Sequence, residues 1–228
     1  MSFQSELTRV GAVAWKDLTT ERRSKANFNA VVFLAALMLL MFGFALGPDT
    51  AALRSAAAGI LWLTVLFSGN LAFHRSYQVE LERGALESLL LYPGARSSIF
   101  LGKLIANLVF VLLVEAVLIP LAIVLYDIPL EGRLWGVLLV VLLGTVGFVT
   151  LGTFYASMAS RSRAREVLLP LLLFPMLVPV LVASVEGTSS LLAGDPMGDG
   201  GRWIQLLVAF DTIFLGASIL AFGAVIEE

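Results

Sequence analysis

The stretch LIANLVFVLLVEAVLIPLAIVLY, from Leu104 to Tyr126, decides which kind of fold this chain adopts. Glu115 is the only acidic or basic residue in it. A helix needs about 20 residues to cross a hydrocarbon core of ~30 Å, and this stretch is long enough. An unpaired backbone amide in lipid costs several kcal/mol, so a run of this kind is expected to cross a membrane as a helix.

Five more segments of the chain reach a similar length. The six expected spans are residues 28–46, 56–73, 104–126, 134–158, 167–185 and 203–226. The composition agrees, because 59% of the residues are hydrophobic and 14% are charged, whereas about a quarter are charged in a soluble domain. The sequence therefore predicts an all-α integral membrane protein with six transmembrane helices in residues 28–228, after an N-terminal segment at 1–27 and with a polar insert at 74–103.

Several classes of function are disfavoured by the residues that the chain lacks. Cysteine is absent, which excludes disulfides and thiolate ligands, and a net charge of −2 offers no basic face for nucleic acid. The pair Gly102-Lys103 does not complete a phosphate-binding loop, because Leu104 stands where Ser or Thr would bind magnesium. We expect a protein without catalytic residues, resident metal or bound cofactor.

The distribution of basic residues predicts the orientation, because Lys and Arg are enriched in cytoplasmic loops. Eleven of them precede the first span or lie in the second and fourth loops: Arg9, Lys16, Arg22, Arg23, Lys25, Arg75, Arg83, Arg96, Arg161, Arg163 and Arg165. The other loops carry Arg54, Arg133 and Arg202. Both termini are therefore expected in the cytoplasm, with the first span as an uncleaved signal anchor in the cytoplasmic membrane.

The segment before the first span has the pattern of an amphipathic helix. Its apolar stripe is Phe3, Leu7, Val10, Ala14, Trp15 and Leu18, and its polar residues Glu6, Lys16, Asp17 and Glu21 fall largely elsewhere. Such a helix lies flat in the membrane interface. The alternative is a frayed soluble tail with a few hydrophobic residues.

The insert between the second and third spans has two parts. The second helix is expected to continue into water as far as Gly84. A short helix with an apolar face of Ala85, Leu86, Leu89 and Leu90 follows, and Pro93-Gly94 ends it. This helix suits a groove on a partner protein, and it is equally suited to rest on lipid headgroups or on neighbouring helices.

The insert closely resembles the corresponding loop of the CcmB family, the membrane subunit of the cytochrome c maturation ABC transporter. The shared run is E-x-E-x-G-A-L-E-x-L-L-L-x-P-x-x-R-x-x-I-F-L-G-K, from Glu80 to Lys103. Residues 16–33, KDLTTERRSKANFNAVVF, resemble the basic elbow of that family, and residues 167–182 resemble its proline-containing fifth helix. A looser form of the loop motif occurs across ABC-2 type permeases.

The resemblance implies a homodimeric ABC-2 type permease with an N-terminal elbow helix and a coupling helix between its second and third spans. The coupling helix would bind a separate ATPase of the CcmA type, which would hold ATP and magnesium. The residues implied in that contact are Glu80, Glu82, Arg83, Gly84, Leu86, Glu87, Leu89, Leu90, Pro93 and Arg96. A CcmC-type haem-handling protein and a haem chaperone are the further partners that it implies.

The residues themselves argue against a haem site inside the spans. A haem iron is held by His, Met, Cys or Tyr, and the single histidine, His74, is expected at the cytoplasmic end of the second span. Met38, Met41, Met158 and Met176 are better explained by packing or by contact with lipid. We therefore expect a mechanical role, in which ATP hydrolysis by the partner releases a haem-loaded chaperone. The alternatives are an ABC-2 exporter of a lipid, polymer or drug, and a passive scaffold.

Two acidic residues stand inside the expected spans, where a charge costs about 2.5 to 3.5 kcal/mol even on the mildest scale. Glu115 is the deeper and Asp211 is the next. Each is a candidate to face a dimer interface or a cavity, to pair with a hydroxyl such as that of Thr145, Thr150 or Tyr155, or to be protonated. Three prolines, at positions 170, 175 and 179, are expected to kink or break the fifth span.

Overall fold

The structure, a computed structural model of the chain, describes residues 3–23, 25–82, 96–129, 134–159, 165–195 and 198–225. These residues form helices and no strand. The helices are α1 (Phe3–Arg23), α2 (Lys25–Leu46), α3 (Thr50–Glu82), α5 (Arg96–Tyr126), α6 (Leu134–Ala159), α7 (Arg165–Leu192) and α8 (Gly200–Val225). All except α1 are long and apolar enough to cross a membrane. The predicted all-α membrane protein with six spans is confirmed.

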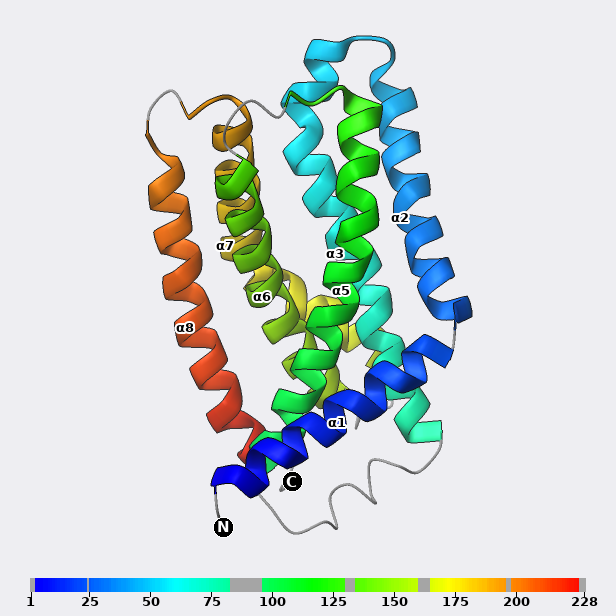
Figure 1. Cartoon of the computed structure of the whole chain (residues 1–228), viewed down its shortest axis with the longest axis vertical. Helices are drawn as coiled ribbons and strands as arrows, with labels where there is room; N and C mark the ends of the chain where they lie inside the picture. Colours follow the sequence, from blue (N-terminus) through cyan, green and yellow to red (C-terminus); the bar gives the residue numbers. More distant parts are fainter. Residues whose placement is uncertain are drawn as a thin grey trace.

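The six long helices run side by side along the long axis of the molecule, and α1 lies across one end of them (Figure 1). Both chain termini lie at that end, which we call the α1 end; the opposite end is the far end. The helices α2 and α8 lie on opposite flanks, with α3 and α5 next to α2 and with α6 and α7 next to α8.

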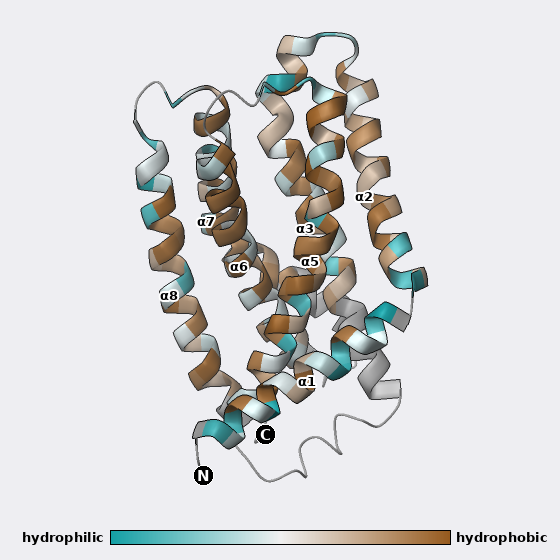
Figure 2. Ribbon diagram, viewed as in Figure 1, coloured by the Kyte–Doolittle hydropathy of each residue, from teal (hydrophilic) through white to brown (hydrophobic). Residues whose placement is uncertain are grey.

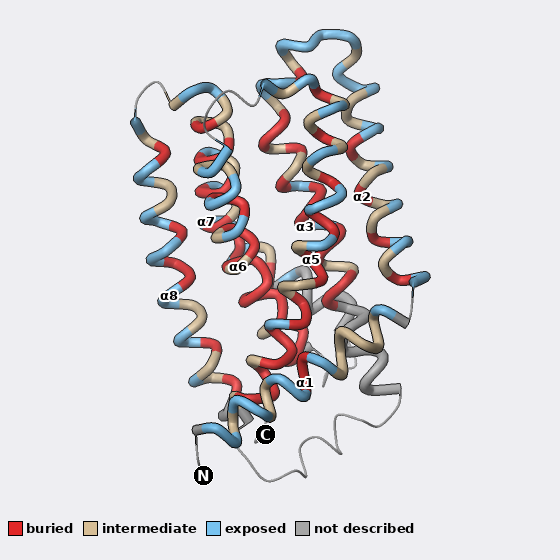
Figure 3. Tube along the Cα trace, viewed as in Figure 1, coloured by how far each residue is buried: buried red, intermediate tan, exposed pale blue. Residues whose placement is uncertain are grey.

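Apolar residues cover the long helices on their inner and outer faces alike, as Figure 2 shows. On α2 the buried residues Val31, Ala35 and Leu39 recur every fourth position, whereas Phe33 and Phe44 are exposed. Figure 3 shows the same division along the other spans, with buried positions facing the bundle interior. Because exposed apolar side chains of this kind are stable in lipid, the outer surface of the bundle is suited to face acyl chains.

The helices extend beyond the spans expected from the sequence. The helix α3 begins at Thr50 and continues to Glu82, in agreement with the expected extension of the second helix past the membrane. The helix α5 begins at Arg96, whereas its span was expected to start at residue 104. Hydropathy detects only the part of a helix that lies in lipid, and polar residues continue both helices outside it.

The structure excludes one of the two alternatives predicted for the fifth span and extends the end of that span. The prolines do not break it, because α7 is helical without interruption from Arg165 to Leu192. The loop expected at residues 186–202 is also shorter, since residues 186–192 belong to α7. Thr188 and Leu191 are buried against the bundle, so tertiary packing favours the additional helical turns.

Helix ends at the far end follow from local sequence. Gly47 has a φ of 70° and ends α2, and the Asp49 carboxylate accepts bonds from the first backbone amides of α3. Gly194, with a φ of 86°, ends α7, and Asp195 accepts a 3.0 Å hydrogen bond from the amide of Gly200 at the start of α8. A short capped turn therefore joins α2 to α3, and the end of α7 and the start of α8 are capped by Gly194 and Asp195.

Candidate functional site at the crossing of α1 and α5

Most residues predicted to bind a partner lie outside the described part of the chain. These are Arg83, Gly84, Leu86, Glu87, Leu89, Leu90 and Pro93. Glu80 and Glu82 belong to the last turn of α3 and Arg96 begins α5, but the described side chains do not include theirs. The structure therefore describes α3 and α5, the helices on either side of residues 83–95. The candidate site lies at the base of α5, by which we mean its first turns from Arg96 to Asn107.

The helix α1 crosses α5 at Gly102, close to the start of α5. A β-carbon on Gly102 would lie 2.6 Å from Cβ of Val13 and 2.9 Å from the carbonyl oxygen of Val10. A side chain at position 102 would therefore overlap α1, and glycine permits this close approach of two helices. Val13 and Ala14 are buried in the contact.

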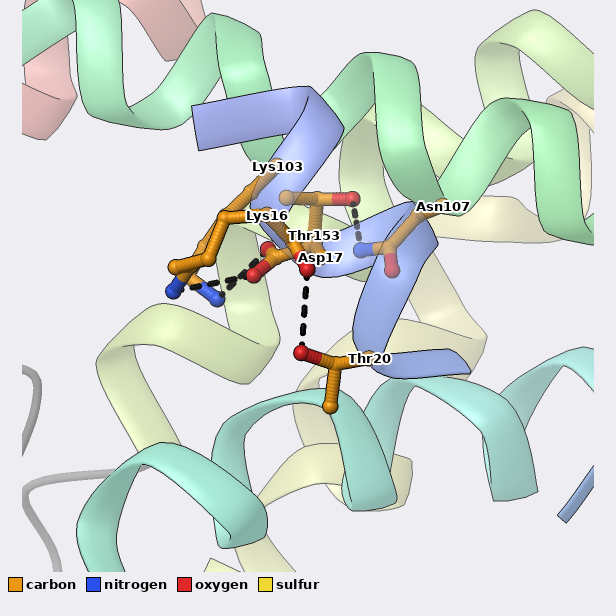
Figure 4. Close-up of polar contacts among 6 residues, drawn as sticks. All are labelled: Lys16, Asp17, Thr20, Lys103, Asn107 and Thr153. Atoms are coloured by element: carbon orange, nitrogen blue, oxygen red, sulfur yellow. Dashed lines mark hydrogen bonds and ion pairs between the residues drawn. The ribbon is translucent and has the colours of Figure 1, made fainter. Parts of the chain in front are cut away.

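An ion pair lies next to this crossing (Figure 4). The Nζ atom of Lys103 is 3.3 Å from Oδ2 of Asp17, and the Lys103 side chain has no exposed surface. Lys16 approaches the other oxygen of the same carboxylate, with Nζ 2.9 Å from Oδ1. A buried ammonium group is stable only when it is paired. Asp17 therefore supplies a negative charge that stabilises the buried Lys103 at the base of α5.

The face that α1 turns to α5 differs from its predicted apolar stripe. Val10, Val13, Ala14 and Asp17 form the face turned to α5, at the helical spacing i, i+3, i+4 and i+7, whereas Leu7 and Trp15 are exposed. The periodicity had placed Asp17 with the polar residues, largely outside the apolar stripe. A basic residue on another helix pairs with it, and the periodicity of α1 alone carries no information about that residue.

Polar contacts continue from this crossing into the bundle. Asn107 lies one helical turn after Lys103, and its amide nitrogen donates a 3.0 Å hydrogen bond to the Thr153 hydroxyl of α6 (Figure 4). Both side chains are buried. The base of α5 is thus bonded to α1 on one side and to α6 on the other.

A small cavity of ≈30 Å³ lies beside the ion pair, where α1, α2, α3 and α5 meet. Its lining includes Asp17, Glu21, Asn27 and Asn107 together with apolar groups. The amide nitrogen of Asn27 donates to Glu21, and its Oδ1 atom has no hydrogen-bond partner among the described residues. A polar cavity of this volume has room for a water molecule.

Glu115 lies on α5 twelve residues after Lys103, ~18 Å further along the helix axis. It is 2% exposed, and its Oε1 atom accepts a 2.7 Å hydrogen bond from the hydroxyl of Thr145 on α6. Thr145 is one of the three hydroxyl groups that the sequence offered as partners. The other oxygen, Oε2, has no partner among the described residues.

Asp211 of α8 packs against the opposite side of α6. A β-carbon on Gly147 would lie 2.6 Å from its Oδ1 atom, and Asp211 is 8% exposed. Neither of its carboxyl oxygens has a hydrogen-bond partner in the described part of the chain. Thr145 and Gly147 are two residues apart, about 200° around α6 and ~3 Å along it. The two carboxyl groups therefore flank α6 at nearly the same depth.

The described residues contain no group of three His, Cys, Asp or Glu side chains that could hold a metal ion. The side chain of His74 lies outside the described side chains. Met41, Met158 and Met176 are exposed on the outer surface of the bundle, as expected of residues that contact lipid. The described site therefore consists of hydrogen bonds and ion pairs between helices, an arrangement that holds helices in register.

Comparison with known proteins gives one consistent family. The model of the family "CcmB protein" matches residues 8–228. "Heme exporter protein B" of Rhodobacter capsulatus is 30% identical over 175 residues, which cover 77% of this chain and 80% of the relative. The protein of the same name from Pseudomonas aeruginosa is 28% identical over 189 residues, covering 82% and 83%. That of Haemophilus influenzae is 30% identical over 168 residues, covering 73% and 75%.

Proposed function

Because the chain belongs to the CcmB protein family, we propose that it is the membrane subunit of a haem exporter that acts in cytochrome c maturation. In this proposal the chain has no catalytic activity of its own. A separate ATPase of the CcmA type binds ATP and magnesium, docks on residues 83–95, and drives a rearrangement of the spans. The observation that carries the proposal is the bonded base of α5, which follows directly after that segment.

The continuity of α5 supports the transmission of movement from the docking segment to the spans. It is one helix from Arg96 to Tyr126, so a displacement at its start reaches the interior of the bundle. Lys103, Asn107 and Glu115 then join it to α1 and to α6 along its length. The ATPase would hold the apolar face predicted for Leu86, Leu89 and Leu90. The charges of Glu80, Glu82, Arg83, Glu87 and Arg96 would fix its register.

The buried polar residues favour a mechanical role over a haem site within this subunit. Tyrosine is one of the side chains that hold haem iron, but the hydroxyl of buried Tyr126 already donates a 2.7 Å hydrogen bond to the Leu39 carbonyl. Glu115 is bonded to Thr145. We propose that the stroke of the ATPase releases a haem-loaded chaperone from a CcmC-type partner.

We also propose an orientation for the bundle in the membrane and a dimeric assembly. The α1 end faces the cytoplasm, because both termini and most of the basic residues lie on one side of the predicted spans. The chain resides in the cytoplasmic membrane of the cell and pairs with a second copy of itself, so that two coupling segments meet two ATPase subunits.

The test uses cells that lack this chain and make c-type cytochromes. The double variant Leu86→Asp, Leu90→Asp is expected to lose co-purification with the ATPase and to abolish holocytochrome c. The matched control is Leu46→Asp, an exposed leucine that ends α2 at the far end. Retention of the ATPase by the double variant would refute the docking segment. Normal holocytochrome c in cells without the chain would refute the assignment to haem delivery and would favour a different exporter.

A further inference from the structure

The ion pair between Asp17 and Lys103 joins the interfacial helix to the helix that follows the proposed docking segment. We propose that Asp17 is a positioning residue: by holding α1 on the buried Lys103, it makes α1 and the base of α5 move as one unit. This inference rests on the proposed function, since the unit would carry movement from residues 83–95.

Two independent contacts at consecutive residues support the unit. At Gly102 the helices approach so closely that a β-carbon would lie 2.6 Å from Cβ of Val13. At Lys103 the charge of the ammonium group is met by the Asp17 carboxylate of the same α1 face. A sliding movement of α1 along α5 would separate the ion pair, and a lifting movement would expose a buried charge. The crossing therefore resists both.

The unit of α1 and the base of α5 is connected to the docking segment at one end and to α2 at the other. Lys103 is seven residues after Arg96, ~10 Å along a continuous helix, so the crossing is close to the start of α5, which follows the proposed docking segment in the sequence. At its other end α1 reaches Arg23, and one residue separates it from α2 at Lys25. A displacement at the start of α5 would thus pass through Asp17 to α1 and then to α2 on the flank of the bundle.

Docking of α1 can be measured without any functional assay, because the chain contains no cysteine. Val13 is buried at the crossing and Trp15 is 73% exposed. In membranes, Val13→Cys is expected to react slowly with a maleimide reagent, and Trp15→Cys, the matched control on the same helix, is expected to react fast. Adding Asp17→Lys should accelerate labelling of Val13→Cys by roughly tenfold or more, since breaking a buried ion pair is strongly destabilising. Labelling of Trp15→Cys should be unchanged.

The specific role of the charges is tested by exchanging them. The double change Asp17→Lys, Lys103→Asp restores an attractive pair and is expected to slow the labelling of Val13→Cys to within about threefold of the parent, as coupled residues do in a double-mutant cycle. Asp17→Asn, which keeps the shape and removes the charge, is the second variant if Asp17→Lys does not accumulate. Unchanged labelling in Asp17→Asn and Asp17→Lys would overturn the proposal.

A second measurement, made on the complete complex, tests whether the unit transmits movement. Asp17→Lys is expected to keep the ATPase bound while holocytochrome c falls by roughly tenfold, and the exchanged pair should recover it. Normal holocytochrome c despite a displaced α1 would overturn the role in transmission. Loss of the ATPase from Leu86→Asp, Leu90→Asp is a separate result, so failure of the proposed function is distinguishable from failure of this inference.

Discussion

Glu115 and Thr145 are joined by a hydrogen bond of 2.7 Å between α5 and α6, and they lie in the same register as Asn107 and Thr153. From Asn107 to Glu115 the chain advances eight residues on α5, and from Thr153 to Thr145 it returns eight residues on α6. Two interhelical hydrogen bonds therefore fix one antiparallel alignment of α5 and α6. One lies near the α1 end and the other in the middle of the bundle.

Removal of the Thr145 hydroxyl should weaken this alignment. Thr145→Val leaves the Glu115 carboxyl without a described partner, and we expect a loss of about 1 to 3 kcal/mol in the free energy of unfolding. The measurement is unfolding in nanodiscs of one lipid composition. Thr212→Val is the control, because Thr212 is exposed and its hydroxyl donates a hydrogen bond to the Val208 carbonyl of its own helix. Equal stability of the two variants would show that the bond does not hold α5 to α6.

Close packing of α6 against α3 gives a second prediction. A methyl group on Gly152 would overlap the ring of Phe73, which is fully buried. Gly152→Ala should therefore destabilise the protein by about 1 to 3 kcal/mol, the usual cost of overpacking. Gly216→Ala on α8 meets nothing within 4 Å and should be neutral or slightly stabilising, since alanine favours a helix. Comparison of the two midpoints of thermal unfolding checks this, and a similar effect at both sites would contradict it.

Hydropathy alone predicted the six spans, because a membrane imposes a minimum length on apolar runs whatever their packing. It misplaced helix ends outside lipid, at Thr50, Arg96 and Leu192, where polar residues continue the helix. The interfacial helix was predicted from periodicity, but not the face that it turns to the bundle. That face includes Asp17, whose position follows from a lysine 86 residues away in sequence. Pairings of this kind cannot be found from local pattern.

In the candidate site, too, single residues were predicted from local sequence and most of their distant partners were not. Glu115 was singled out because an acidic residue in a span is costly, and its hydroxyl partner was one of three named alternatives. In the sequence, Lys103 stood out only in the pair Gly102-Lys103 and as the last residue of the loop motif. The burial of Lys103 depends on where α1 crosses α5. Gly102 was the residue in the sequence that could have indicated a close crossing.

The buried indole of Trp62 supports a third prediction. Its Nε1 atom donates a 3.1 Å hydrogen bond to the Thr188 hydroxyl of α7, and the residue is 2% exposed. Trp62→Phe removes this bond and leaves a gap, so the free energy of unfolding should fall by about 2 kcal/mol. Trp135, at the start of α6, is 83% exposed, and Trp135→Phe should have little effect. Equal stability of the two variants, compared by thermal unfolding in nanodiscs, would argue against this role of α3 and α7 contacts.

The orientation of the bundle can be tested with single cysteines in this cysteine-free chain. Gln4 is exposed on α1, and Ser55 is exposed near the start of α3 at the far end. If the α1 end faces the cytoplasm, a membrane-impermeant maleimide should label Ser55→Cys in spheroplasts and Gln4→Cys only in inverted vesicles. The physical reason is the retention of Lys and Arg on the cytoplasmic side during insertion, and the sequence predicts eleven basic residues on that side. Labelling of Gln4→Cys in intact spheroplasts would reverse the topology and place residues 83–95 out of reach of any cytoplasmic ATPase.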